Sequence, residues 1–78
     1  MTHRDYADRL ATMAPGECRW IGREDLHVYC MGSRIDGRYR PDVRQFKLVT
    51  AGRPFASADN AWTTATDVAR AIQKAIIN

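Results

Sequence analysis

The fold is decided by residues 14–31, which read APGECRWIGREDLHVYCM. The proline and glycine near its start end the helical pattern that precedes them, and the side chains then alternate with the period of two that is typical of strands. Two such strands, joined by the short polar segment 22–25, predict a β-hairpin. Centring the hairpin on Glu24 puts four side chains on the core face in two facing pairs, Trp20 with Val28 and Cys18 with Cys30.

Helical patterns lie on both sides of this hairpin. Thr2 as N-cap with Asp5 three residues later predicts a helix over residues 3–14, which Pro15-Gly16 ends. In the last third, Thr64 and Asp67 form a second N-terminal pair and predict a helix over 64–77. Its apolar stripe consists of Ala61, Ala65, Val68, Ala69, Ile72, Ala75 and Ile76.

A third strand is predicted over Val43–Thr50, with Phe46 and Leu48 toward the core. Residues 32–42 contain an Asp36-Gly37 turn signal and form a basic connection with a bulged extension of the second strand. Two alternatives stay open for residues 55–63: a short fourth strand at Trp62-Thr63, or a loop that fills the core with Phe55 and Trp62.

The order of elements predicts one α+β domain over residues 1–78: a helix, a three-stranded antiparallel sheet and a helix, with both helices on one face and the other face open. A chain of 78 residues holds one small core. Only 14 residues are Val, Ile, Leu or Phe, so we expect modest stability. This size excludes barrel enzymes and doubly wound nucleotide folds.

The net charge of +3 is unevenly distributed. Residues 34–53 carry six basic side chains against two acidic ones, and ten of the twelve basic residues in the chain are arginine. The planar guanidinium suits carboxylates and phosphates. Because no apolar run approaches the length of a membrane span and the N-terminus is polar, we expect a cytoplasmic protein with two reduced thiols.

Catalytic and metal chemistry are not expected. Cys18, His27 and Cys30 are the nearest set of zinc ligands, but His27 and Cys30 point to opposite faces of a strand. The same argument excludes a Cys–His nucleophile. Two small apolar side chains in facing strands, or a cross-strand disulfide, explain the cysteines instead. The acidic residues lie in caps and turns, and no glycine pattern cradles phosphate, so we expect neither an enzyme nor a cofactor.

Binding is the function that remains. The outward face of the predicted sheet mixes apolar, aromatic and cationic side chains: Arg19, Ile21, His27, Tyr29, Met31, Gln45, Lys47 and Val49. Such a face favours contact with another protein or with a second copy. Arginine and tyrosine dominate many interfaces, and we therefore predict these partner contacts: Arg34, Arg38, Arg40, Arg44 and Arg53, with Tyr29 and Tyr39 as aromatic anchors.

The order of elements, the Gly52 turn and the alanine-rich last helix resemble the layout of double-stranded RNA-binding domains. That family grips phosphates with lysines at the start of its last helix. The corresponding residues here are Thr63-Thr64-Ala65-Thr66-Asp67, with an acid where cations are required. An RNA grip of that type is therefore not expected.

In size and build, the chain also resembles the small phage-encoded inhibitors called anti-CRISPR proteins, a class that no residue motif defines. The resemblance implies an inhibitor that docks on a bacterial nucleic-acid-handling complex. Members that mimic DNA are strongly acidic, whereas this chain is basic. We therefore expect it, in the host cytoplasm if phage-encoded, either to cover an acidic or mixed protein surface or to bring nucleic acid to the wrong place through its arginines.

Two further functions stay open. In the first, the same arginines contact the phosphates of double-stranded RNA or DNA directly, and affinity then falls steeply with salt. In the second, the chain is a scaffolding subunit that dimerises through the open sheet face.

Overall fold

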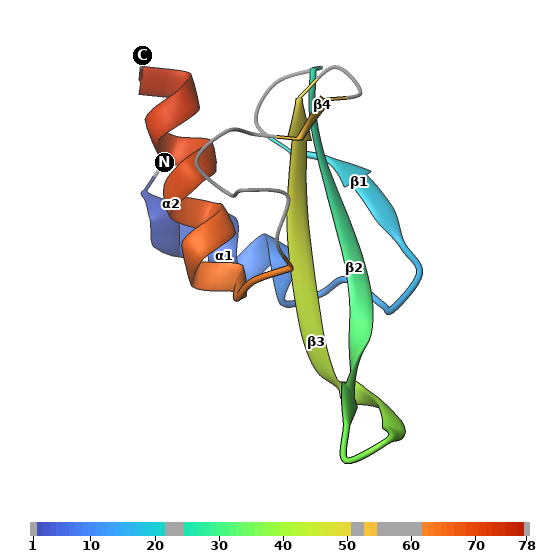
Figure 1. Cartoon of the computed structure of the whole chain (residues 1–78). Helices are drawn as coiled ribbons and strands as arrows, with labels where there is room; N and C mark the ends of the chain where they lie inside the picture. The colour runs from blue at the N-terminus through green and yellow to red at the C-terminus, as the bar shows by residue number, and fades with distance from the viewer. Residues whose placement is uncertain (1, 22–24, 51–52, 55–61, 78) are drawn as a thin grey trace.

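The computed structural model describes residues 2–21, 25–50, 53–54 and 62–77 of the chain. Its elements are, in order, α1 (His3–Leu10), β1 (Cys18–Trp20), β2 (Leu26–Ile35), β3 (Arg38–Thr50), β4 (Arg53–Pro54) and α2 (Ala65–Ile77). The strands form one antiparallel sheet in the order β1-β2-β3-β4. The two helices contact each other on one side of the sheet (Figure 1). The predicted α+β fold is confirmed, with the two-residue β4 added beside β3.

The core lies between the helices and the inner face of the sheet. Every second residue points into it over residues 26–30 of β2 and 46–48 of β3, as strand geometry requires. The buried side chains are Tyr6, Leu10, Met13, Ile21, Leu26, Val28, Cys30, Phe46, Leu48, Val68, Ala69 and Ile72. Full burial of one larger member contributes about 1.5–3 kcal/mol.

Helix α1 begins as predicted. The Thr2 N–H donates to the Asp5 carboxylate at 2.7 Å, and this bond lowers the pKa of Asp5. The helix ends at Leu10 instead of residue 14, because residues 11–12 form a turn that brings Met13 into the core. Eight residues are too few for a helix that is stable alone, so α1 depends on its tertiary contacts.

Helix α2 is confirmed almost to the residue. The Asp67 N–H donates to the Thr64 hydroxyl oxygen at 3.2 Å, and Thr63 donates its own hydroxyl to the Asp67 carboxylate at 2.8 Å. These two bonds fix the first turn. The predicted stripe is buried at Val68, Ala69 and Ile72.

The predicted register of the first hairpin is wrong by one residue. Cys18 pairs with Tyr29, Arg19 with Val28 and Trp20 with His27. A shift of one residue turns every side chain of a strand to the other face. Trp20 is consequently 64% exposed, whereas Ile21, predicted to face outward, is 4% exposed. Arg19 also turns inward, where its guanidinium meets the end of α1.

The register also separates the two cysteines. Cys18 is exposed on the outer side of the sheet and Cys30 is buried on the inner side, so the predicted facing pair and the cross-strand disulfide are both wrong. Burial raises the pKa of the Cys30 thiol. His27 and Cys30 lie on opposite faces as predicted.

The second hairpin is longer than predicted. β3 begins at Arg38 instead of Val43. The predicted extension of the second strand is confirmed, because β2 continues to Ile35. The turn between them is Asp36-Gly37, whose φ angles of 53° and 77° are those of the tight turn that matches strand twist. A bulge lies between Gly32 and Ser33, where the partner of β2 jumps from Arg44 to Arg40.

Beside β3, the backbone of Thr63 pairs with Phe46 through two hydrogen bonds of 2.8 Å, a single bridge instead of a fourth strand at Trp62-Thr63. Trp62 is 40% exposed, so the alternative in which it fills the core is wrong. Phe55 and the loop centre at Glu24 lie outside the described residues. Neither described helix has the length and apolar character needed to cross a membrane.

Candidate binding surface

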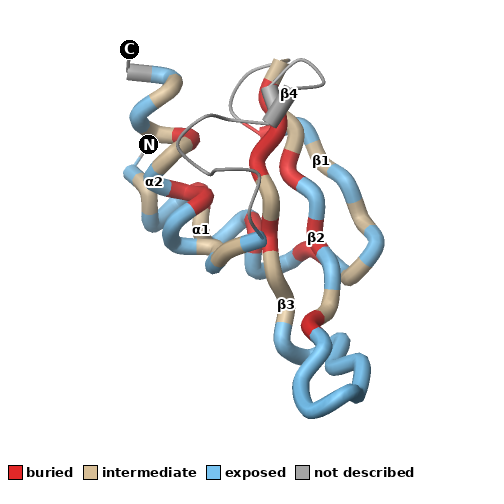
Figure 2. Tube along the Cα trace, in the orientation of Figure 1, coloured by how far each residue is buried: buried red, intermediate tan, exposed pale blue. Residues whose placement is uncertain are grey.

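The long hairpin carries most of the predicted partner contacts away from the body of the molecule. We call residues 33–43 the arm. It projects below the helices (Figure 1), and every residue from 34 to 43 is exposed (Figure 2). The molecule measures 39 × 23 × 17 Å along its principal axes. An exposed two-stranded projection of this kind can enter a groove on a partner.

The three arginines of the arm differ in their surroundings. Arg34 and Arg38 are exposed, and neither forms a side-chain hydrogen bond or ion pair with the described part of the chain. Arg40 pairs with Asp42 at 2.8 Å, and both side chains are exposed. This guanidinium lowers the pKa of Asp42. Exposed pairs contribute little to stability, so a partner can displace this one at small cost.

The base of the arm is held by packing and two hydrogen bonds. Gly32 donates its N–H to the Tyr39 hydroxyl at 3.2 Å, and Ser33 donates its hydroxyl to the Val43 carbonyl at 2.7 Å. A Cβ atom at Gly32 would lie 2.7 Å from Tyr39 Cζ and 2.8 Å from the Arg40 carbonyl oxygen. Any side chain here would force the bulge to shift, whereas glycine allows it to close.

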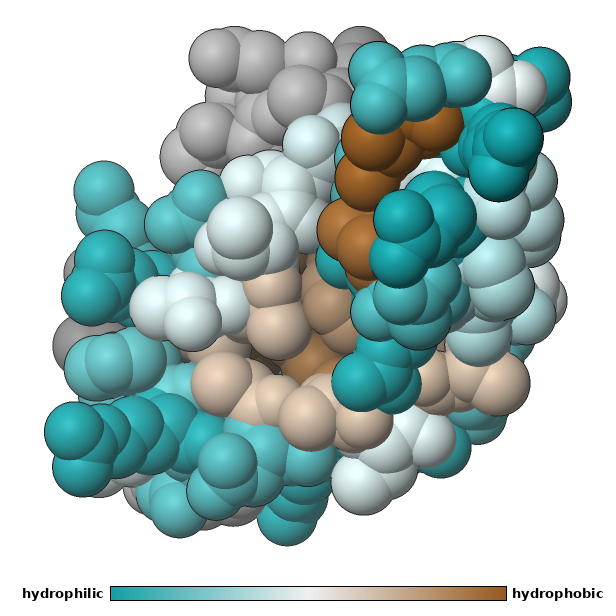
Figure 3. All heavy atoms as spheres, turned by 90° about the horizontal axis from the view of Figure 1, so that it is seen from below, coloured by the Kyte–Doolittle hydropathy of each residue, from teal (hydrophilic) through white to brown (hydrophobic). Residues whose placement is uncertain are grey.

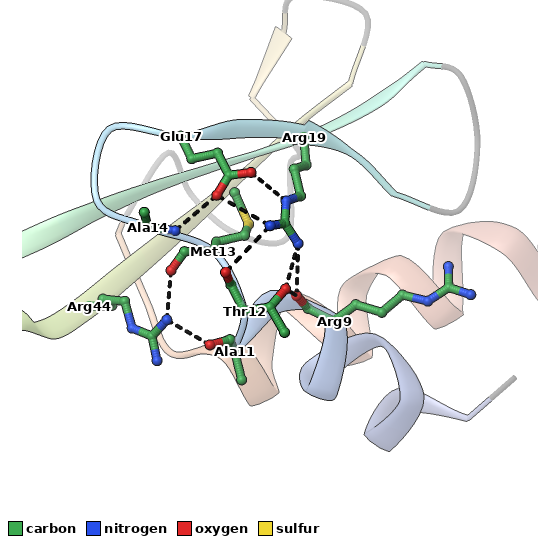
Figure 4. Close-up of polar contacts among 8 residues, drawn as sticks. All are labelled: Arg9, Ala11, Thr12, Met13, Ala14, Glu17, Arg19 and Arg44. Carbon is green, nitrogen blue, oxygen red and sulfur yellow. Dashed lines mark hydrogen bonds and ion pairs between the residues drawn. The ribbon is translucent and has the colours of Figure 1, made fainter.

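Arg44 lies in β3 just beyond the arm and has a structural role. Its Nη1 donates to the Ala11 carbonyl at 2.7 Å and to the Met13 carbonyl at 2.6 Å (Figure 4). These carbonyls follow the end of α1, where a positive charge is also favourable to the helix dipole. Arg44 is half-buried.

Arg19 meets the same helix end from β1 (Figure 4). Its Nη1 donates to the Thr12 hydroxyl at 2.6 Å and to the Arg9 carbonyl at 3.3 Å. Glu17 holds this guanidinium in an ion pair and accepts the Ala14 N–H at 2.9 Å. The Arg19 bond and then the Ala14 bond lower the pKa of Glu17. We call Glu17, Arg19 and Arg44 the clasp.

The outer face of the sheet differs from its prediction in β1. We define the outer face as Cys18, Trp20, His27, Tyr29, Met31, Gln45, Lys47, Val49 and Trp62. Cys18 and Trp20 take the places expected for Arg19 and Ile21. The rings of Trp20 and His27 meet edge to face with centroids 3.8 Å apart. Lys47 Nζ lies 5.8 Å from the Trp62 ring centroid, within cation–π range.

Two open hollows continue this face. One, of about 350 Å³, is lined by Tyr29, Met31, Lys47, Val49 and Trp62 together with Gly16, Glu17 and Cys30. The other, of about 450 Å³, shares Met31 and Trp62 and extends to Arg34 and Tyr39 on the arm. The outer face and the base of the arm therefore form one continuous surface.

Of the predicted contacts, the structure groups Arg34, Arg38, Tyr39 and Arg40 on the arm and places Tyr29 at the centre of the outer face. Arg53 lies in β4, beside the far end of β3. Sequence reasoning missed Trp20 and Trp62. Exposed apolar groups occur on the arm as well, at Ile35 and Val43. The view from below shows hydrophobic atoms between hydrophilic ones (Figure 3).

Among the described residues, no three His, Cys, Asp or Glu side chains gather closely enough to hold a metal ion. Comparisons with protein-family models, with curated proteins and with solved structures found no match to this chain.

Proposed function

We propose that this chain is a non-enzymatic binding protein that inhibits a bacterial nucleic-acid-handling complex by docking on it with the arm. The observation that carries the proposal is the pair of exposed arginines, Arg34 and Arg38, on a projecting hairpin. Holding two guanidinium groups in solvent stabilises nothing within the described fold. Both groups are therefore available to the carboxylates or phosphates of a partner.

Other features of the arm support this role. Tyr39, 49% exposed, and the apolar Ile35 and Val43 accompany the arginines. Interfaces combine such aromatic and apolar anchors with arginine. The tight turn and the closely packed bulge at Gly32 hold the arm in one shape, which reduces the entropy lost on binding.

The experiment tests inhibition and its dependence on the arm together. The chain is expressed in bacteria that carry a CRISPR system and are challenged with a targeted plasmid, across a panel of system types. We expect restored transformation with at least one type, and loss of that effect in the Arg34→Glu/Arg38→Glu variant. The matched control is Arg4→Glu/Arg70→Glu, which reverses two exposed helix arginines and should keep the effect. Equal loss in both double variants would contradict docking by the arm.

Direct binding of duplex nucleic acid is a second candidate. It is favoured by the two-stranded form of the arm, because the major groove of DNA admits a β-ribbon. Gel shifts with generic duplex DNA and RNA test it. Affinity carried by several phosphate contacts should fall by orders of magnitude between about 50 and about 200 mM salt. No shift at the lower salt concentration would remove this candidate.

A further inference from the structure

We propose that the outer face binds single-stranded nucleic acid, with a base in the hollow between Tyr29, Lys47 and Trp62. The three side chains follow one another across the sheet. Tyr29 and Lys47 are cross-strand partners, and Trp62 lies on the far side of Lys47, in cation–π contact with it. The hollow that would hold the base contains neither Arg34 nor Arg38, on which the proposed docking rests, so the inference does not depend on that docking; only the onward path of the strand reaches Arg34.

Exposure of the aromatic rings is the first argument. Tyr29 is 41% exposed and Trp62 is 40% exposed. Exposed aromatic rings on a strand surface are stacking platforms for bases, since every base has a π face. The hollow between them, about 350 Å³, falls in the size range of small-ligand pockets.

Charge is the second argument, and it selects the occupant. The outer face carries the cation Lys47 and contains no aspartate or glutamate. Glu17 borders the hollow, but its carboxylate is held by Arg19 and the Ala14 N–H. A second copy stacked on this face would bring Lys47 no carboxylate from an identical face, leaving a buried unpaired charge. A polyanion with flat rings satisfies both the cation and the aromatic groups.

The neighbouring hollow gives the strand a path. It shares Met31 and Trp62 with the first hollow and reaches Arg34 at the base of the arm. A phosphate that leaves the first site can therefore meet a guanidinium within the same surface. Bases on aromatic rings and phosphates on cations are the combination that single-strand binders use.

The test uses Trp62 as its own reporter. The Trp20→Phe variant has Trp62 as its single tryptophan. Unlabelled oligo-dT of about 12 nucleotides, a length that covers a typical single-strand site, is titrated into this variant. We expect quenching of Trp62 fluorescence that saturates. Anisotropy of labelled oligo-dT should show affinity about tenfold weaker for Tyr29→Ala and for Trp62→Ala. Ile76→Ala, which removes exposed apolar surface from α2, is the control and should bind normally.

Lys47→Gln gives a second readout, the salt dependence of the affinity, which a merely structural effect would not change. It should lower the slope of log affinity against log salt by about 1, the contribution of one phosphate contact. Circular dichroism melts check that each variant folds. Trp62→Phe should recover most of the affinity for oligo-dT that Trp62→Ala loses. The proposal is overturned if Trp62 fluorescence is not quenched. It is also overturned if poly-glutamate binds equally well, which would assign the face to an acidic peptide, or if the chain dimerises and buries Trp62, which would assign the face to a second copy.

Discussion

The clasp and the arm use the same side chain for opposite purposes. In the clasp, Arg19 and Arg44 donate to carbonyl and hydroxyl oxygens at the end of α1, and these hydrogen bonds stabilise the fold. On the arm, Arg34 and Arg38 have no such acceptor within the described residues. The difference lies in what surrounds each arginine. The end of a short helix leaves backbone carbonyls without hydrogen-bond partners. In a two-stranded ribbon, the backbone carbonyls are paired between the strands.

The comparison shows why the net charge of residues 34–53 overstates the positive charge that is available to a partner. Arg44 belongs to the clasp, and Arg40 is paired with Asp42. What remains exposed and unpaired on the arm is Arg34 and Arg38. A variant that changes these two is therefore a sharper probe of binding than one that includes Arg40.

The largest effect is expected where the clasp is broken. Arg44→Met removes two charge-assisted hydrogen bonds while keeping the apolar stem, and should lower the free energy of unfolding by about 2–3 kcal/mol. Arg38→Met, on the arm, should change it by less than about 0.5 kcal/mol. Urea denaturation followed by circular dichroism measures both. Similar losses in the free energy of unfolding for the two variants would mean that the arginines of the clasp and of the arm contribute equally to stability.

A smaller effect is expected at the base of the arm. Gly32→Ala brings a Cβ atom against Tyr39 and the Arg40 carbonyl, so the bulge must shift, at a cost of about 1–2 kcal/mol. The same urea experiment measures the loss, and amide exchange at Ser33 and Tyr39 should rise while exchange in α1 stays unchanged. Faster exchange in α1 would show that the arm and the clasp are coupled.

The smallest effect depends on pH and concerns Glu17. Because the folded chain holds the pKa of Glu17 below its ordinary value, ionised Glu17 stabilises the fold above that ordinary pKa, and the stabilisation disappears as the pH falls through the folded pKa. Glu17→Gln should therefore be less stable than the parent near neutral pH. The difference should vanish in acid, once the pH has fallen below the folded pKa of Glu17. Thermal melts across this range measure it, and a difference that grows in acid would contradict the assignment.

The sequence predicted α2 and the core positions of β2 and β3 well because their patterns are redundant. In α2, several apolar positions agree on one face, and Thr64 and Asp67 mark its start. In β2 and β3, five large side chains alternate consistently. No single residue could reverse these assignments.

The register of β1 was not predictable by the same reasoning. The strand has three residues, and its neighbourhood offers two alternations, Cys18 with Trp20 or Arg19 with Ile21. Hydrophobicity favours the first, but the acceptors at the end of α1 favour an inward Arg19. These acceptors exist only once α1 has stopped at Leu10, so local sequence holds no signal for them. The placement of Trp20 and Trp62 on the outer face was missed for related reasons: Trp20 follows the register, and Trp62 follows the Thr63 bridge to Phe46.

The separation of the two cysteines makes the native chain ready for site-specific labelling. Cys18 is exposed in the row that also contains Tyr29 and Lys47, whereas Cys30 is buried, and its raised pKa slows its reaction with maleimides. A fluorophore or spin label can thus be attached at one position without engineered thiols. Such a probe would report directly on whatever approaches the outer face.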